Sequence, residues 1–508
     1  MAAPTDLVER SRRPNHRAKF DRRVDEQVER LRGQLEAGRF DNPEFGIGLE
    51  VEAYAVDDAG RLARLPGDVF DGLDGCAREL GRHNVEFNTA PTPFDGDGIE
   101  SQAIQLRRLY RDFQRGARAS GLEVVLDAMW AVPPAEGTRA YLSDVEDRDG
   151  VAIATNMTPD PRYWAIDDEV VSRASGSITL SVPGVACSFP SILFESLTSS
   201  IQPHLQLPRV DLFPRYHALA IRTLGPVLAL ATNSPLLPAD LYEADDPYAI
   251  LEDTAHELRV PVFEQSVNRS WQKVRVPQDV DSAGDSLERL REDPTCAPFL
   301  REWLDAGDRE TVHDRYWELD HKRGTYWRWL RPVFGGRPVG DGDRRSIRLE
   351  YRPLPTQPTV ADNVGFLCLV AGLLTGLAAT DHPLPSLEWT AAERCFYDVV
   401  ADGLAADLAW ITADGERTDD PSIVYDELFS LARRGLREMG VDATVADRYL
   451  GPIEARWERS LTPSRWKLDR VRDGLERGLG FEAAVEEMQA AYVRRAGTQE
   501  SFAEWPGV

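Results

Sequence analysis

Residues 45 to 54 read FGIGLEVEAY, an apolar segment interrupted by two carboxylates, Glu50 and Glu52. Because a β-strand points alternate side chains to opposite faces, this segment predicts a strand with both carboxylates on one face and its apolar side chains on the other. Two carboxylates this close repel each other unless a cation lies between them, and Mg²⁺ prefers oxygen ligands. The segment therefore predicts either a magnesium site or a strand with a solvated acidic face.

Two later segments also carry acidic side chains on predicted strands. Glu86 lies within the strand-like sequence HNVEFNT. Alternation in a further strand, IRLEYR, places Glu350 between Arg348 and Arg352 on one face. An acid between two arginines stays ionised, which suits a metal site or a structural ladder of ion pairs.

A histidine flanked by two amides lies in the middle of the chain. On an extended backbone Gln202, His204 and Gln206 share one face. Neighbouring amides can fix the tautomer of a histidine, or hold the carboxylate and amine of a substrate. A lone histidine is more often a core or surface residue, but these neighbours make His204 a candidate ligand.

The charge of the chain is unusual for its size. Its 508 residues include 59 Lys and Arg against 85 Asp and Glu, a net charge of −26, and only four of the basic residues are lysines. An acidic excess with Arg in place of Lys indicates adaptation to a salt-rich cytoplasm, where screening weakens self-repulsion. A nucleic-acid partner is not expected, because phosphate backbones bind basic surfaces.

The other compositional features also favour a cytoplasmic protein. Five cysteines lie far apart, so neither a disulfide framework nor a zinc site is expected. No apolar segment follows the arginines near the N-terminus, so we expect no signal peptide, and these arginines are expected to face solvent. The longest apolar run, residues 364 to 379, is shorter than a membrane span and predicts a buried helix.

Two stretches predict irregular structure. Residues 132 to 170 are rich in Pro, Gly and Asp and predict a long loop. Residues 236 to 322 are acidic and broken, and predict mobile loops over a site, with helical patches at 285 to 292 and 296 to 306.

Taken in order, the acidic strands and the histidine segment resemble the glutamate–cysteine ligase family, including its carboxylate–amine ligase branch, within the glutamine synthetase superfamily. Supporting matches lie at Pro159 to Tyr163, Asn233-Ser234-Pro235, Trp329 to Pro332 and Glu393-Arg394. The motifs that carry the resemblance are Gly48-Leu49-Glu50-Val51-Glu52, Glu86-Phe87-Asn88-Thr89-Ala90-Pro91, Gln202-Pro203-His204 and Arg348-Leu349-Glu350-Tyr351-Arg352.

The resemblance implies an α+β fold with a curved, mostly antiparallel sheet. Its open concave face would hold Mg²⁺, ATP and glutamate, helices would pack on the outer face, and the C-terminal region would be helical. The implied metal ligands are Glu50, Glu52, Glu86, His204 and Glu350; the implied catalytic residues are Glu50, Glu350 and Arg352; and Gln202, Arg331 and Arg352 would bind ATP or substrate.

The implied division of the chain is a helical N-terminal arm at 1–40, a catalytic domain at 41–385 and a C-terminal helical region at 386–508 packed on it. The implied reaction joins the γ-carboxylate of glutamate to the amine of cysteine through an acyl phosphate. Two alternatives remain open: the same chemistry with another amine, or an inactive binding protein on the same fold. A metal-dependent hydrolase is disfavoured because the sequence has no clustered His/Asp ligand motif. The sequence indicates neither the oligomeric state nor the amine.

Overall fold

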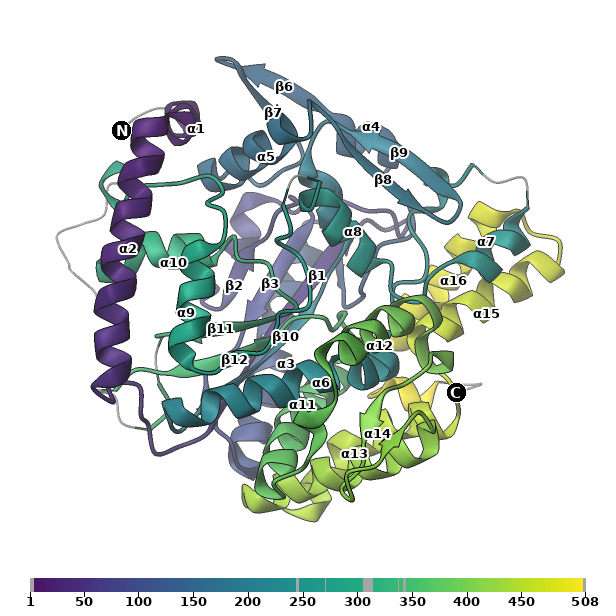
Figure 1. The fold of residues 1–508 in the computed structure, drawn as a ribbon. Helices are drawn as coiled ribbons and strands as arrows, with labels where there is room; N and C mark the ends of the chain where they lie inside the picture. Colours follow the sequence, from purple (N-terminus) through teal and green to yellow (C-terminus); the bar gives the residue numbers. More distant parts are fainter. Residues whose placement is uncertain are drawn as a thin grey trace.

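The structure is a computed structural model that describes residues 4–243, 246–269, 271–304, 314–336, 338–340 and 344–505. Within these residues an eight-stranded sheet forms the centre of the molecule, and every pairing in it is antiparallel (Figure 1). The strands run β11-β12-β10-β1-β3-β2, and β4 and β5 also pair with β1. Their bounds are β1 Gly46–Val56, β2 Cys76–Arg78, β3 Asn84–Asn88, β4 Thr92–Pro93, β5 Glu123–Val125, β10 Ile201–Leu207, β11 Leu330–Phe334 and β12 Ile347–Tyr351.

The alternation predicted for the first strand is present in β1. Leu49, Val51 and Ala53 are fully buried on the outer face, while Glu50 and Glu52 lie on the opposite, concave face. Helices α3 (Gly96–Ala119) and α11 (Val360–Ala379) pack on this outer face, and α6 (Phe213–Ala231) packs against α11. The predicted α+β architecture is therefore confirmed.

Helix α11 contains the long apolar run of the sequence. Among the described residues it is the one helix long and apolar enough to span a membrane, and 89% of its most apolar window is buried inside the protein. Glycines let its neighbour approach closely: a Cβ on Gly376 would lie 2.0 Å from the carbonyl oxygen of Leu431 in α13 (Pro421–Glu438). The predicted buried core helix is confirmed.

The N-terminal helices α1 (Pro4–Arg12) and α2 (Pro14–Glu36) lie along one side of the molecule, away from the C-terminal helices (Figure 1). The expectation that their arginines face solvent holds for Arg12 and Arg13, which are exposed, whereas Arg17 is half-buried. Arg12 pairs with Asp168, and Arg17 Nη2 lies 2.8 Å from Glu169, both acids lying on α5 (Pro161–Arg173). These ion pairs fix the arm to the main body.

The loop predicted for residues 132 to 170 is wrong. This stretch contains α4 (Thr138–Ser143), the hairpin β6 (Val145–Arg148) and β7 (Val151–Ala154), and the start of α5. A second hairpin, β8 (Ile178–Val182) and β9 (Val185–Phe189), follows it. Asp149 and Gly150 have φ of 55° and 81° in the β6–β7 turn, a conformation that glycine adopts without strain.

The segment from 236 to 322 holds α7 (Pro247–Asp253), α8 (Arg259–Val267), α9 (Ala283–Glu292) and α10 (Trp317–Arg323). The predicted helix at 285 to 292 is confirmed. The one at 296 to 306 is wrong over its described residues, which hold only a short 3₁₀ turn at Arg301–Trp303. Its last residues, 305 and 306, lie outside the described part of the chain.

The C-terminal region is helical, as predicted. It consists of α12 (Trp389–Asp402), α13 (Pro421–Glu438), α14 (Ala443–Glu458), α15 (Pro463–Glu476) and α16 (Phe481–Ala496), with a small hairpin of β13 (Trp410–Ile411) and β14 (Arg417–Thr418). α13 and α14 pack on α11, and α12 packs on α6. The region therefore covers the helical layer behind the sheet.

Candidate active site on the concave face

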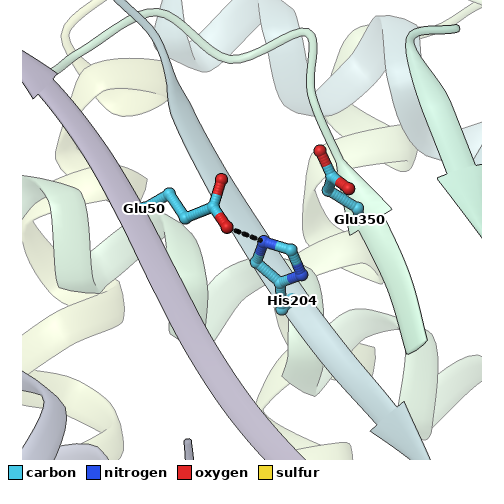
Figure 2. A group of neighbouring side chains, drawn as sticks. All are labelled: Glu50, His204 and Glu350. Carbon is cyan, nitrogen blue, oxygen red and sulfur yellow. Dashed lines mark ion pairs between the residues drawn. The ribbon is translucent and has the colours of Figure 1, made fainter. Parts of the chain in front are cut away.

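Glu50, His204 and Glu350 meet at the centre of the concave face, one from each of the adjacent strands β1, β10 and β12 (Figure 2). The antiparallel register places His204 directly opposite Glu350. One potential ligand atom from each of the three residues lies within 4.8 Å of the others. His204 Nε2 is 3.1 Å from Glu50 Oε1. Three residues from distant parts of the sequence thus form one cluster.

The chemistry of this cluster fits a divalent cation. Both ring nitrogens of His204 are buried, and neither makes a hydrogen bond within the described structure. Glu350 is buried as well. His204 Nε2 has only the carboxylate of Glu50 beside it, at 3.1 Å, and an imidazole between two carboxylates is a suitable set of donors for a hard or borderline cation. The residues could therefore hold a metal ion between β1, β10 and β12.

Two arginines hold Glu350 in its ionised form. Arg331 Nε donates to Glu350 Oε2 at 2.7 Å, and Arg352 donates to the other carboxylate oxygen. Burial alone would raise the pKa of Glu350, but the charges of Arg331 and Arg352 outweigh it and lower that pKa well below its usual range. Arg352 Nη1 also donates to Gln202 Oε1 at 2.5 Å. Gln202 therefore positions Arg352.

Glu50 is also kept ionised. Burial opposes ionisation of Glu50, but the adjacent charge of His204 outweighs it, so the pKa of Glu50 is lowered. The two carboxylates of the cluster are thus anionic, and they face each other across the imidazole of His204. This is the charge state that cation binding requires.

A second acidic group lies beside the first and consists of Glu52, Glu79 and Glu86. Glu52 and Glu86 are directly opposite each other on β1 and β3, and Glu79 follows β2. Burial and the charge of Glu52 raise the pKa of Glu79 to about 7. Burial and the three nearby carboxylates, Glu50 first, raise that of Glu86 well above its usual range. Burial first, and then the repulsion between these acids, favours their protonated forms and raises the pKa of each.

Glu79 was not predicted from the sequence. It follows a strand of only three residues, so no alternation indicates which way its side chain points. Its Oε2 accepts hydrogen bonds from the hydroxyl of Tyr163 at 3.4 Å and from the backbone amide of Leu80 at 3.3 Å. The position of Glu79 becomes evident only when the β2–β3 pairing is known.

Glu50 of the first cluster and all three acids of the second group line one cavity of about 470 Å³, whereas His204 and Glu350 do not line it. Its acidic floor meets a cationic and aromatic wall, which comes largely from α5, α10 and the strand segment before β11. The predicted site residues Glu50, Glu52, Glu86, Gln202, Arg331 and Arg352 line it, together with Glu79, Arg162, Tyr163, Glu195, Phe263, Trp317, Asp320, His321, Arg323 and Trp327. The segment 236 to 322 thus contributes walls to the cavity, while its closure over a substrate stays a prediction.

A smaller hollow of about 40 Å³ lies on the other side of Glu50. Gly46, Gly48, His204, Gln206 and Arg348 line it. The two glycines continue the concave face of β1 beyond Glu50 without side chains. Glu50 therefore lies between the larger cavity and this hollow, and a ligand in either one can approach the cluster of Glu50, His204 and Glu350.

The sequence profile of glutamate-cysteine ligase family 2 matches residues 46–497 of this chain. The chain belongs to this family. The match includes every strand of the central sheet and all the predicted site residues. The resemblance inferred from the four motifs is thereby confirmed, and so is the assignment to an ATP-dependent ligase family.

Individual relatives are distant. A protein of Rhodococcus jostii, whose name assigns it provisionally to glutamate–cysteine ligase 2-1, is 26% identical over 208 residues, which are 39% of this chain and 43% of that relative. The glutamate–cysteine ligase of Francisella tularensis, solved in complex with AMP, has 14% identity and a TM-score of 0.54 over 91% of this chain and 90% of its own. A bifunctional glutathione synthetase from Pasteurella multocida has 15% identity and a TM-score of 0.53, over 92% of this chain and 55% of its own. These structures share the fold of the family member described here.

Proposed function

We propose that this member of glutamate-cysteine ligase family 2 is an ATP- and Mg²⁺-dependent ligase of the cytoplasm that joins the γ-carboxylate of glutamate to the amine of cysteine. The observation that carries the proposal is the pairing of two acidic groups with Arg331 and Arg352 around one cavity. Carboxylates alone would repel a phosphate, and arginines alone would bind one without activating it. Together with cations, they suit the transfer of a phosphoryl group.

The reaction has two steps. A carboxylate oxygen of glutamate attacks the γ-phosphorus of ATP, the bond to the bridging oxygen breaks, and ADP leaves with the electron pair. The amine nitrogen then attacks the carbonyl carbon of the acyl phosphate, inorganic phosphate leaves, and the nitrogen loses a proton. The first step supplies the leaving group that a free carboxylate lacks at neutral pH.

In this proposal one set of residues binds Mg²⁺ and another binds the phosphate or the substrate. Glu50, His204 and Glu350 would hold one Mg²⁺, and Glu52, Glu79 and Glu86 a second. Bound Mg²⁺ would neutralise phosphate charge as it develops. Arg352, fixed by Gln202 and Glu350, contacts the phosphate in this proposal, and Arg331 serves the phosphate or the substrate carboxylate. Because the pKa values of Glu79 and Glu86 are raised, cation binding by this group would release protons.

A second candidate is the same reaction with another amine. The wall of the cavity is aromatic, with Phe263, Trp317 and Trp327, and Glu195 and Asp320 add acidic groups near it. Such a wall accepts an amine that carries an apolar or cationic group as readily as it accepts cysteine. An inactive binding protein is the remaining alternative, and the intact acidic groups argue against it.

One assay tests the proposal directly. Phosphate release from ATP and glutamate is measured with cysteine and with a panel of other amines, in high potassium chloride because the net charge is −26. We expect release that depends on Mg²⁺, on glutamate and on one amine. Release with an amine other than cysteine supports the second candidate, and no release with any amine contradicts both.

Variants of the central cluster test the site. Glu50→Gln and Glu350→Gln keep the shape of the side chain but remove its charge, so we expect each to lower turnover by about two orders of magnitude or more. Arg394→Gln, at an exposed position of α12, is the matched control and should keep normal turnover. Normal turnover in both glutamate variants would show that the site is assigned wrongly.

A further inference from the structure

A second cavity, of about 580 Å³, lies behind one wall of the candidate active site. It is bounded by α8, by α9, by α12 and by the segment from Gln272 to Gln278. None of the predicted site residues lines it. The lining of this cavity includes three arginines, Arg275, Arg289 and Arg328, together with four carboxylates, Glu264, Glu292, Asp293 and Glu393.

The wall between the two cavities is the strand segment from Tyr326 to Arg331. Its side chains alternate: Trp327 and Arg331 line the active-site cavity, whereas Tyr326 and Arg328 line the second one. Trp329 Nε1 donates at 3.0 Å to Glu264, which also lines the second cavity. A ligand in the second cavity would therefore contact the reverse side of the segment that carries Arg331.

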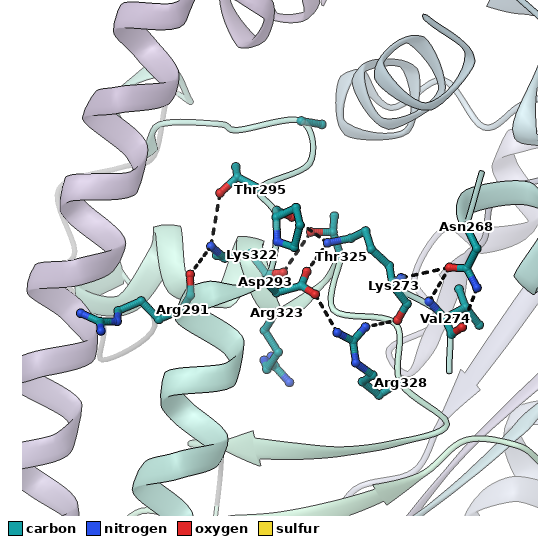
Figure 3. Close-up of polar contacts among 12 residues, drawn as sticks. Asn268, Lys273, Val274, Arg291, Asp293, Thr295, Lys322, Arg323, Thr325 and Arg328 are labelled. Carbon is teal, nitrogen blue, oxygen red and sulfur yellow. Dashed lines mark hydrogen bonds and ion pairs between the residues drawn. The ribbon is translucent and has the colours of Figure 1, made fainter. Parts of the chain in front are cut away.

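Part of this cavity carries an excess of positive charge. Arg328 Nη2 lies 2.8 Å from Asp293, but this carboxylate also pairs with the buried Lys273, so a single carboxylate faces two cations (Figure 3). Arg289 donates to the carbonyl oxygens of Gln278 and Asp279 and forms no ion pair with a described residue, although Glu292 of the same helix also lines the cavity.

Arg275 is the cation that this part of the cavity leaves without a partner. Its guanidinium makes no hydrogen bond or ion pair with any described residue, and it is solvent-exposed. Burial of part of the side chain and the nearby charges of Arg328 and Arg289 lower the pKa of Arg275. A carboxylate bound here would relieve that repulsion and form charge-assisted hydrogen bonds.

The other part of the cavity carries carboxylates with free acceptor positions. Trp329 and Tyr397 both donate to one oxygen of Glu264, at 3.0 and 2.8 Å, and no described residue donates to the other. Glu393, on the same helix as Tyr397, has no hydrogen bond or ion pair within the described structure. Burial raises the pKa of both carboxyls. An ammonium group would satisfy these acceptors.

We propose that this second cavity binds the head group of a free α-amino acid or γ-glutamyl peptide, with its carboxylate on Arg275 and its ammonium between Glu264 and Glu393. Arg275 and Glu393 both line the cavity and form no ion pair with each other, so each charge is available to one end of a zwitterion. The volume of the cavity accommodates a ligand of this size.

Calorimetric titration of the full chain without ATP or Mg²⁺ tests the proposal. The probes are L-glutamate, γ-glutamylglycine and N-acetylglutamate, which lacks the ammonium group. We expect saturable binding of glutamate, of the dipeptide or of both, which distinguishes substrate from product as the source of the ligand. Arg275→Gln and Glu393→Gln should each weaken it about tenfold or more, because each removes a charge-assisted contact.

Two variants serve as controls. Arg394 is the sequence neighbour of Glu393 but does not line the second cavity, so Arg394→Gln is a local control. Arg352→Gln changes the active-site cavity instead. Both should leave this binding intact. Absence of saturable binding for both amino-acid probes would overturn the proposal. It would also fail if N-acetylglutamate bound equally well, or if Arg275→Gln and Glu393→Gln bound with the affinity of the unchanged chain.

The binding test does not depend on turnover, so its result is separate from that of the proposed ligase function. If the chain is a ligase, occupancy of the second cavity would act on Arg331 through the shared strand segment. In that case glutamate above saturation should change turnover in the unchanged chain, and Arg275→Gln should abolish this change while keeping the basal rate.

Discussion

Replacement of Lys467 by methionine is expected to destabilise the protein strongly, although this residue lies in a C-terminal helix with no catalytic motif. Lys467 Nζ donates to Asp127 Oδ1 at 2.6 Å and to the carbonyl oxygen of Asn233 at 2.8 Å, and both charged side chains are buried. Asp127 Oδ2 in turn accepts from Gln489 at 2.8 Å and from Tyr54, at the end of β1, at 3.2 Å. The pair thus joins α15 and α16 to the strand that carries Glu50.

The magnitude follows from the charge that the substitution leaves behind. Removing one partner of a buried ion pair costs about 3–5 kcal/mol of unfolding free energy, because the other charge stays buried. Asp127 keeps donors from Tyr54, Gln489 and the amide of Ala128 at 2.7 Å, so we expect about 3 kcal/mol, at the low end of that range. Adding Asp127→Asn to Lys467→Met should recover part of this loss, since it removes the uncompensated charge.

Urea unfolding followed by tryptophan fluorescence measures these changes as shifts of the midpoint at constant m. Lys19→Met is the matched control: Lys19 pairs with Glu302, both partly exposed, and such a pair is worth less than about 1 kcal/mol. The reasoning is refuted if Lys467→Met is as stable as Lys19→Met, or if the double variant is less stable than Lys467→Met alone.

Two further predictions concern the acidic groups. In the folded protein the pKa of Glu79 is raised to about 7, above its value in the unfolded chain. Without Mg²⁺, the stability that the protonated carboxyl contributes is therefore present at low pH and is lost as pH rises through 7. The rise in melting temperature on adding Mg²⁺ should therefore be larger at about pH 8 than at about pH 5, and an equal rise at both would contradict the assignment of this group to a cation site. Burial raises the pKa of Glu195 to about 8, so its contribution to stability is likewise lost as pH rises through that value. Glu195→Gln should gain stability relative to the unchanged chain as pH rises from about 5 to 9 in thermal melts, and parallel pH profiles would refute this.

The sequence predicted the concave face well because alternation in a strand is a local property. Glu50 and Glu52 share a face whatever their strand pairs with, and the same holds for Glu350 and Arg352. The contact of His204 with Glu350 depends instead on which strands are neighbours and in what register, which no local pattern contains. The family resemblance implied only that these residues share one site, and the register that brings His204 opposite Glu350 comes from the structure.

The errors have local causes as well. The stretch 132 to 170 was predicted as a loop because of its composition, although Asp149-Gly150 between two short β-prone runs is a hairpin signal. Asp160 followed by Pro161 is likewise a helix start, and the side chain of Asp160 accepts the amide of Arg162 as an N-cap. In both places specific turn and cap residues were more informative than the average composition.

The lysines show how the acidic composition and the interior of the protein are connected. All four lie in the described part of the chain, and Lys273, Lys322 and Lys467 are buried. Surface positions tolerate arginine in their place, but a buried site fitted to a compact ammonium does not accept a larger planar group. Lys273 lies 5.4 and 5.8 Å from the ring centres of Trp271 and Trp327, beside Asp293, where such a group would have to displace an aromatic ring. Lysine is therefore retained where the packing of the active-site wall and of the C-terminal helices demands it.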